Sequence, residues 1–123
     1  MRTLNYILLA VTNPAMSSKF YAELLGIEPV ENSPTFVLFV LPNGVKLGLW
    51  LTTEIAPAPK AAGGVEITFS EDNRAAVQAS YDDWSRKANI LQEPVDLDFG
   101  FTFVAEDPDG HRLRVFTSAE NAR

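Results

Sequence analysis

The chain contains the same series of short sequence patterns twice, in the same order. An apolar run, a helical pattern, a second apolar run, a Pro-Xaa-Gly turn and a closing strand occupy residues 5–51 and recur in residues 65–116. In this alignment Tyr6 corresponds to Glu66, and Gly48 corresponds to Arg114. An ordered series of this kind indicates a duplicated structural unit, which constrains the fold more than any single motif.

Each half predicts one strand, one helix and about three further strands. The paired segments are 5–11 and 65–69, 15–25 and 73–88, 36–41 and 101–104, and 45–51 and 112–116, and the tripeptide Glu-Pro-Val occurs at 28–30 and 93–95. Residues 54–64 are rich in Pro, Ala and Gly and lack apolar periodicity, which is typical of a linker. We therefore expect an α+β fold with two βαβββ repeats in a single domain of residues 1–123: repeat one 1–53, linker 54–64, repeat two 65–118.

Helix-capping residues predict where the helices begin and end. Asn13 is the expected N-cap of the first helix, Pro14 suits its first position, and Gly26 ends it. Ser70 or Asp72 is the expected cap of the second helix. Apolar residues at spacings of three or four predict one apolar stripe on each helix. The residues are Met16, Phe20 and Leu24 in the first helix and Val77, Tyr81 and Trp84 in the second.

Composition excludes several classes of function. The 123 residues include 16 acidic and 10 basic side chains, for a net charge of −6, whereas nucleic-acid binding needs a basic face. There is no cysteine, which excludes thiol catalysis, disulfides and Cys-ligated metals. The N-terminal apolar run Tyr6–Val11 is shorter than the apolar core of a signal peptide or a membrane span, so we expect a cytoplasmic protein without a membrane partner.

Alternation along the predicted strands separates an aliphatic face from a mixed one. Trp50 and Phe116 share the mixed face with charged Glu66 and Arg114, and such a mixture is typical of a ligand cavity. For Trp50, the alternative to a place in the cavity is an ordinary core position. For Phe99, Phe101 and Phe103 two alternatives stay open: they line the cavity, or they face the helices. The candidate ligand-binding residues are Tyr6, Phe39, Trp50, Glu66, Phe99, Phe101, Arg114 and Phe116.

Two longer motifs resemble a known superfamily. FYAELLGIEPV at 20–30 and EDPDGHRLRVF at 106–116 resemble the vicinal oxygen chelate superfamily, which includes glyoxalase I, extradiol dioxygenases and bleomycin resistance proteins. LGLWLT at 47–52, YDDWSRK at 81–87 and DFGFTFVAEDPDGHRLRVF at 98–116 are most similar to its phenazine-antibiotic resistance proteins. The resemblance implies that the two βαβββ repeats form a curved sheet enclosing a cavity, and that the protein is a homodimer.

The resemblance also raises the question of a metal. Enzymes of the superfamily hold a divalent metal with four inward side chains, and the matching positions here are Tyr6, Gly48, Glu66 and Arg114. Only Glu66 is a good ligand, since glycine has no donor and arginine is cationic. We therefore expect no metal and no cofactor, and an ion pair between Glu66 and Arg114 that is either structural or orients a polar group of a ligand. His111, the one histidine, is expected to be exposed beyond its turn.

These observations favour a function without catalysis. The expected function is binding and sequestration of a small planar aromatic or cationic molecule, as in antibiotic resistance. The first alternative is a metal-dependent glyoxalase-like lyase or dioxygenase with relocated ligands. The second is an interaction module whose cavity is filled by its own side chains.

Overall fold

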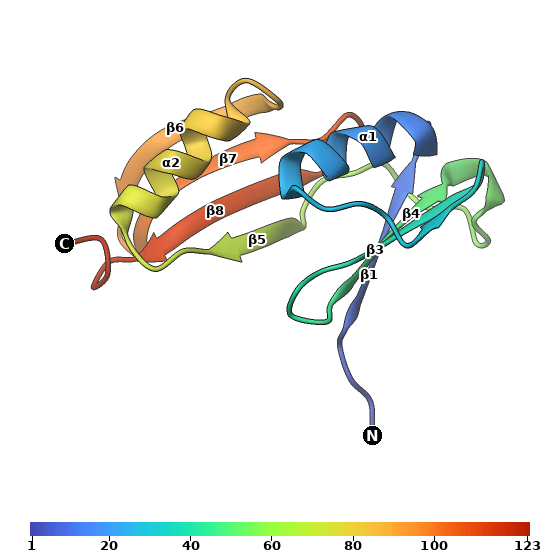
Figure 1. Ribbon diagram of the computed structural model, residues 1–123, viewed down its shortest axis with the longest axis horizontal. Helices are drawn as coiled ribbons and strands as arrows, with labels where there is room; N and C mark the ends of the chain where they lie inside the picture. The colour runs from blue at the N-terminus through green and yellow to red at the C-terminus, as the bar shows by residue number, and fades with distance from the viewer. The chain divides into compact units, whose positions relative to one another are not determined.

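The computed structural model describes residues 1–123 and divides into two compact units, Met1–Ala61 and Ala62–Arg123 (Figure 1). The boundary between them lies inside the predicted linker. Each unit has its own sheet and its own helix. That the two units function as one domain around a shared cavity stays a prediction.

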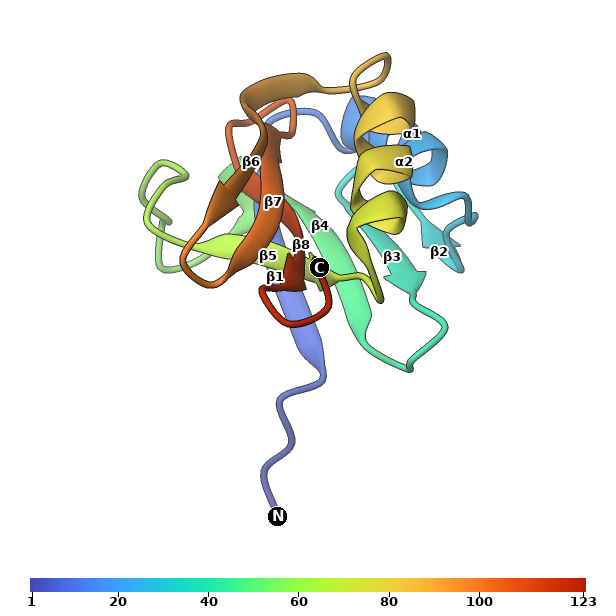
Figure 2. The same cartoon turned by 90° about the vertical axis from the view of Figure 1, so that its left-hand side faces the viewer.

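The first unit is a four-stranded mixed sheet with one helix. Its elements are β1 (Tyr6–Val11), α1 (Pro14–Leu25), β2 (Glu31–Asn32), β3 (Phe36–Val40) and β4 (Lys46–Leu51), followed by the short 3-10 helix η1 (Thr52–Glu54). The strand order is β1-β4-β3-β2, with β1 parallel to β4 and the other pairs antiparallel. Residues 1–5 run away from β1 without regular structure (Figure 2).

The second unit repeats this topology. Its elements are β5 (Glu66–Ser70), α2 (Arg74–Trp84), β6 (Asn89–Leu97), β7 (Gly100–Glu106) and β8 (Arg112–Ser118), in the order β5-β8-β7-β6. Tyr6 lies opposite Lys46 in the first sheet, and its counterpart Glu66 lies opposite Arg112 in the second. The duplication and the α+β fold of two βαβββ repeats are therefore confirmed.

Helix α1 begins and ends where its capping residues predict. The Asn13 side chain accepts a hydrogen bond from the amide of Met16 at 3.1 Å, and Gly26 ends the helix with a φ of 69°. The predicted apolar stripe is wrong at Met16, which is 57% exposed, whereas Tyr21 is fully buried. The buried face of α1 also contains Ser17 and Ser18. Because both are polar, a search for apolar periodicity does not identify this face as the buried one.

Helix α2 differs from its prediction at both ends. Asn73, rather than Ser70 or Asp72, is the N-cap, and its side chain accepts from the amide of Ala76 at 2.8 Å. The helix ends at Trp84, four residues before its predicted end, and residues 85–87 form a turn in which the Lys87 amide donates to the Trp84 carbonyl at 2.9 Å. None of the helices is long and apolar enough to cross a bilayer.

The helix covers one face of the sheet in each unit. In the second unit Trp84 is buried by edge-to-face ring contacts with Phe69 and Phe103, at 5.5 and 5.7 Å between ring centroids. Trp84 is therefore a core residue, as its helical spacing predicts. The opposite face of each sheet is free of its helix, and the mixed face lies there.

Candidate functional site

An apolar pocket lies on the helix-free face of the first sheet. Strand alternation turns Leu47 and Leu49 towards the core and places Trp50 on the other face. A pocket of about 460 Å³ is lined by Tyr6, Leu8, Phe36 and Trp50. This volume lies within the range of small-molecule sites, and all four lining side chains offer apolar or aromatic surface.

Gly48 lies directly beneath two of the lining side chains. A Cβ atom at this position would come within 2.7 Å of Leu8 Cδ2 and 3.0 Å of Phe36 Cζ. Leu8 and Phe36 therefore occupy the volume that any other residue at position 48 would fill. The glycine allows both side chains to lie low against the sheet, which leaves room above them.

The sequence pattern missed two lining residues and misplaced one. Phe36 lies opposite Trp50, and Leu8 lies opposite Gly48, so both are on the pocket face. Phe39 lies opposite Leu47 and is fully buried on the helix side, so we leave it out of the binding surface. Strand β3 is apolar on both faces, and only its register with β4 distinguishes Phe36 from Phe39.

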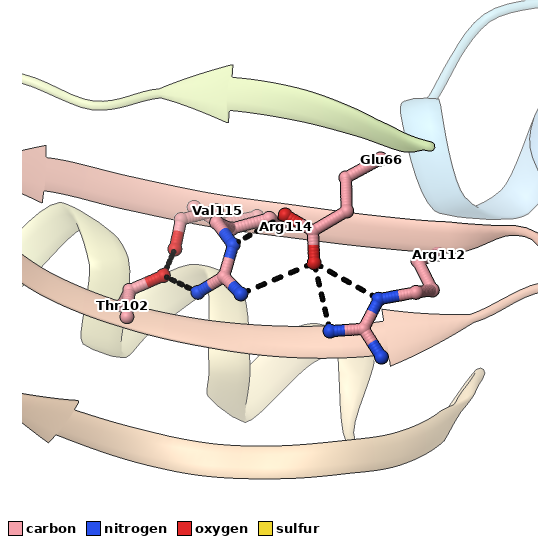
Figure 3. Close-up of polar contacts among 5 residues, drawn as sticks. All are labelled: Glu66, Thr102, Arg112, Arg114 and Val115. Atoms are coloured by element: carbon pink, nitrogen blue, oxygen red, sulfur yellow. Dashed lines mark hydrogen bonds and ion pairs between the residues drawn. The ribbon is translucent and has the colours of Figure 1, made fainter. Parts of the chain in front are cut away.

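A cluster of charged side chains lies on the helix-free face of the second sheet (Figure 3). The Glu66 Oε1 atom accepts from Arg114 Nε at 2.7 Å, and Oε2 accepts from Arg114 Nη2 at 3.1 Å and from Arg112 Nε at 2.9 Å. The predicted ion pair between Glu66 and Arg114 is confirmed. Arg112, which the sequence pattern did not single out, is a second partner of the same carboxylate.

These contacts govern the charge of Glu66. Hydrogen bonds from Arg114, and next from Arg112, lower the Glu66 pKa from 4.5 to about 2 against the opposing effect of burial. Arg114 also donates from Nη1 to the Thr102 hydroxyl at 3.1 Å, and this hydroxyl donates to the Val115 carbonyl at 2.8 Å. We call Glu66, Thr102, Arg112 and Arg114 the arginine cluster.

The candidate phenylalanines divide between the two faces of the second sheet. Phe99 lies beside the cluster, with its ring centroid 5.7 Å from Arg114 Cζ and 6.0 Å from the Phe116 ring. Phe101 lies under the guanidinium of Arg74, at 4.2 Å, on the face that carries α2. Phe103 packs against Trp84 on that same face. Phe101 therefore lies on the helix side of its sheet, as Phe39 does, and is no longer a candidate ligand-binding residue.

His111 is not exposed as expected. Its Nδ1 atom lies 2.7 Å from Asp107 Oδ2, and its side chain is 16% exposed. The hydrogen bond to the buried Asp107 carboxyl raises the pKa of His111. Asp107 Oδ1 also accepts from the amides of Asp109 and His111, so the pair holds the turn that precedes β8.

The sequence profile of the Glyoxalase/Bleomycin resistance protein/Dioxygenase superfamily matches residues 3–115. The chain belongs to this superfamily. The match spans both units. It agrees with the two βαβββ repeats, each of which contributes one sheet and one helix.

Relatives within the superfamily differ in what they are named for. The phenazine antibiotic resistance protein EhpR of Enterobacter agglomerans is 30% identical over 120 residues, which cover 92% of this chain and 90% of EhpR. A protein of Agrobacterium tumefaciens solved by NMR is 45% identical with a TM-score of 0.86, covering 97% and 99% of the two chains. A glyoxalase-related enzyme of Fulvimarina pelagi, 20% identical with a TM-score of 0.84 and 96% and 89% coverage, shows the shared fold alone.

The superfamily's metal positions do not fit a metal in this chain. Both oxygens of Glu66 accept hydrogen bonds from arginine, and Arg114 itself occupies a second ligand position. At a third, Gly48, a donor side chain would collide with Leu8 and Phe36. No group of three or more His, Asp or Glu side chains is placed to hold a metal ion.

Proposed function

We propose that the protein binds a planar aromatic small molecule in the pocket formed by Tyr6, Leu8, Phe36 and Trp50, and that it sequesters this molecule without altering it. The observation that carries the proposal is the pocket itself, which is about 460 Å³ in volume and has apolar and aromatic walls. Aromatic side chains stack on planar rings, and burying a ring between them releases water from apolar surface.

The chemistry of the lining residues supports binding rather than catalysis. Among the four lining side chains, only the Tyr6 hydroxyl and the Trp50 indole N–H are polar, and neither is paired with a general base in the hydrogen bonds of the structure. Homology to EhpR supports a role in antibiotic resistance, and a phenazine has the flat three-ring shape that the pocket would bind.

Sequestration sets a requirement on affinity. Free drug falls only when protein outnumbers drug and the dissociation constant is below about 1 μM, which corresponds to roughly −8 kcal/mol. Stacking and apolar burial are the interactions that would supply this free energy.

Calorimetric titration with phenazine tests the proposal. We expect saturable binding, recovery of phenazine with unchanged mass, and about tenfold or greater loss of affinity in Trp50→Ala because a stacking surface is removed. Trp84→Phe is the matched control, since Trp84 is buried in the second unit. Absence of binding by any planar antibiotic would favour an interaction module, and a product of changed mass would identify an enzyme.

A further inference from the structure

The arginine cluster contains more cationic groups than it needs for its own carboxylate. Two guanidinium groups share the single carboxylate of Glu66. We infer that this cluster binds a small planar carboxylate, and that an aromatic carboxylate is the preferred class. This inference goes beyond the proposed function, because the cluster belongs to the second unit and shares no residue with the pocket of the first.

Arg112 has a hydrogen-bond donor available for a ligand. Its Nε and Nη2 atoms both contact Glu66 Oε2, at 2.9 and 2.8 Å. Its Nη1 atom has no protein acceptor and points away from Glu66 (Figure 3). The side chain of Arg112 is 40% exposed, so a ligand can approach it from solvent. A guanidinium with free N–H groups is the side chain best matched to a carboxylate.

An acidic residue on the strand next to Arg112 does not neutralise it through a direct contact. Glu106 lies opposite Arg112 on the neighbouring strand β7. Its carboxylate accepts from the Asn89 side-chain amide at 2.7 Å, on the side of β6, and forms no ion pair with either arginine. The only carboxylate that contacts Arg112 is therefore the one shared with Arg114.

Arg114 is held in place before any ligand arrives. Glu66 accepts from its Nε and Nη2 atoms, and Thr102 accepts from its Nη1 atom. The side chain is only 17% exposed. A cation fixed in this way loses little conformational entropy on binding an anion, and its partial burial reduces screening by water.

Two phenylalanines beside the cluster favour a ligand with an aromatic ring. Phe99 is 46% exposed and lies 5.7 Å from the Arg114 guanidinium carbon. The centroids of the Phe116 and Phe99 rings are 6.0 Å apart, in an edge-to-face arrangement. Both rings belong to the Arg114 side of the cluster. An aromatic carboxylate held by the two guanidinium groups with its ring turned towards Phe99 would add a ring contact to the ionic one.

An NMR titration of isotope-labelled protein with benzoate tests the inference. Acetate carries the charge without the ring, and benzamide carries the ring without the charge; sodium chloride keeps the ionic strength equal. We expect saturable shifts of the Arg112 and Arg114 Nε–Hε signals and of the Phe99 amide with benzoate, weaker shifts with acetate, and none with benzamide. Equal shifts with benzamide, or no saturable shift with benzoate, would overturn the inference.

Two arginine variants locate the site. Arg112→Gln is expected to weaken benzoate binding about tenfold, the loss of one charge-assisted hydrogen bond. The matched control is Arg74→Gln, because Arg74 also stacks on a phenylalanine but is paired one to one with Asp96. Shifts centred on Arg74, or equal losses in both variants, would refute the assignment. If Arg112→Gln fails to fold, the benzoate titration of the wild-type protein still decides whether the cluster binds a carboxylate. A separate titration with uncharged phenazine, followed by the NMR signal of the Trp50 indole N–H, tests the proposed function.

Discussion

At the scale of single residues, Glu66 is the one superfamily metal-ligand position that keeps a good ligand, and its contacts nevertheless oppose metal binding. The carboxylate is present, but both oxygens accept hydrogen bonds from Arg112 and Arg114. A permanently charged guanidinium holds the carboxylate ionised and also repels a divalent cation. The same contacts therefore stabilise the second sheet and oppose metal binding.

The stability of the protein should depend on the ionisation of Glu66. Its folded pKa, about 2, is below the ordinary value of 4.5, so its contribution is present above pH 4.5 and is lost as the pH falls towards 2. Because Arg112 is 40% exposed, water screens part of its attraction to Glu66. We therefore expect ionised Glu66 to contribute about 1–2 kcal/mol to the free energy of unfolding. Urea unfolding should show Glu66→Gln less stable by this amount at pH 7, with the difference vanishing near pH 2.

The control for this experiment is Glu120→Gln, which removes an exposed carboxylate near the C-terminus. It should leave the free energy of unfolding at pH 7 unchanged. A Glu66→Gln variant whose deficit persists unchanged at pH 2 would show that packing, rather than charge, causes the loss.

At the scale of elements, strand β4 connects the core to the pocket. Leu47 and Leu49 are buried on its helix side, and Gly48 and Trp50 lie on the other. The register with β1 and β3 then brings Leu8 and Phe36 over Gly48. One strand thus fixes the first unit's core and also the floor of its pocket.

Gly48→Ala is expected to reduce the pocket. The added methyl group would push Leu8 and Phe36 into the space above them, and overpacking of this kind costs about 1–3 kcal/mol. We expect about tenfold weaker phenazine binding by calorimetry, while thermal unfolding remains cooperative. Adding Leu8→Ala should restore part of the affinity by returning volume. Unchanged affinity in Gly48→Ala would show that the pocket is not the binding site.

The N-cap of α2 offers a test at the level of a helix. The Asn73 side chain satisfies the Ala76 amide, so Asn73→Ala should destabilise the protein by about 1 kcal/mol in urea unfolding. Asp72→Ala, one position earlier, removes an exposed residue that is not the cap and should change stability by less than about 0.5 kcal/mol. Equal effects of the two changes would contradict the assignment of the cap.

At the scale of the whole molecule, duplication places two similar scaffolds in one chain with different surfaces. The helix-free face of the first sheet carries an apolar pocket, and that of the second carries the arginine cluster. Tyr6 in the first unit and Glu66 in the second occupy equivalent positions. Divergence at a few such positions, rather than a change of fold, therefore distinguishes the two faces.

Self-association is the prediction that belongs to this scale. Strands β1 and β5 each lie at one edge of their sheet, and Tyr6 and Leu8 on β1 are 43% and 52% exposed. Exposed apolar edge strands are sites where a second chain can pair. Sedimentation velocity should show a species of twice the 13.5 kDa chain mass. A single 13.5 kDa species at all concentrations would contradict the predicted homodimer.

Local sequence patterns predict the repeated βαβββ order, the cap of α1 and the two faces of β4 and β8, because each of these depends on residues close together in the chain. Alternation with a period of two needs no partner strand to be recognised. For the same reason the alternation along β8 separates Leu113 and Val115 from Arg114, and both aliphatic residues are buried as predicted.

Which side chains from different strands meet could not be predicted in this way, because it depends on how the folded strands are aligned. Phe36 rather than Phe39 lines the pocket because of the register between β3 and β4. Arg112 joins Arg114 at Glu66 because β5 and β8 are paired in parallel at that register. The distance between side chains on neighbouring strands depends on how the strands are aligned, and a uniformly apolar or uniformly charged face carries no signal of that alignment.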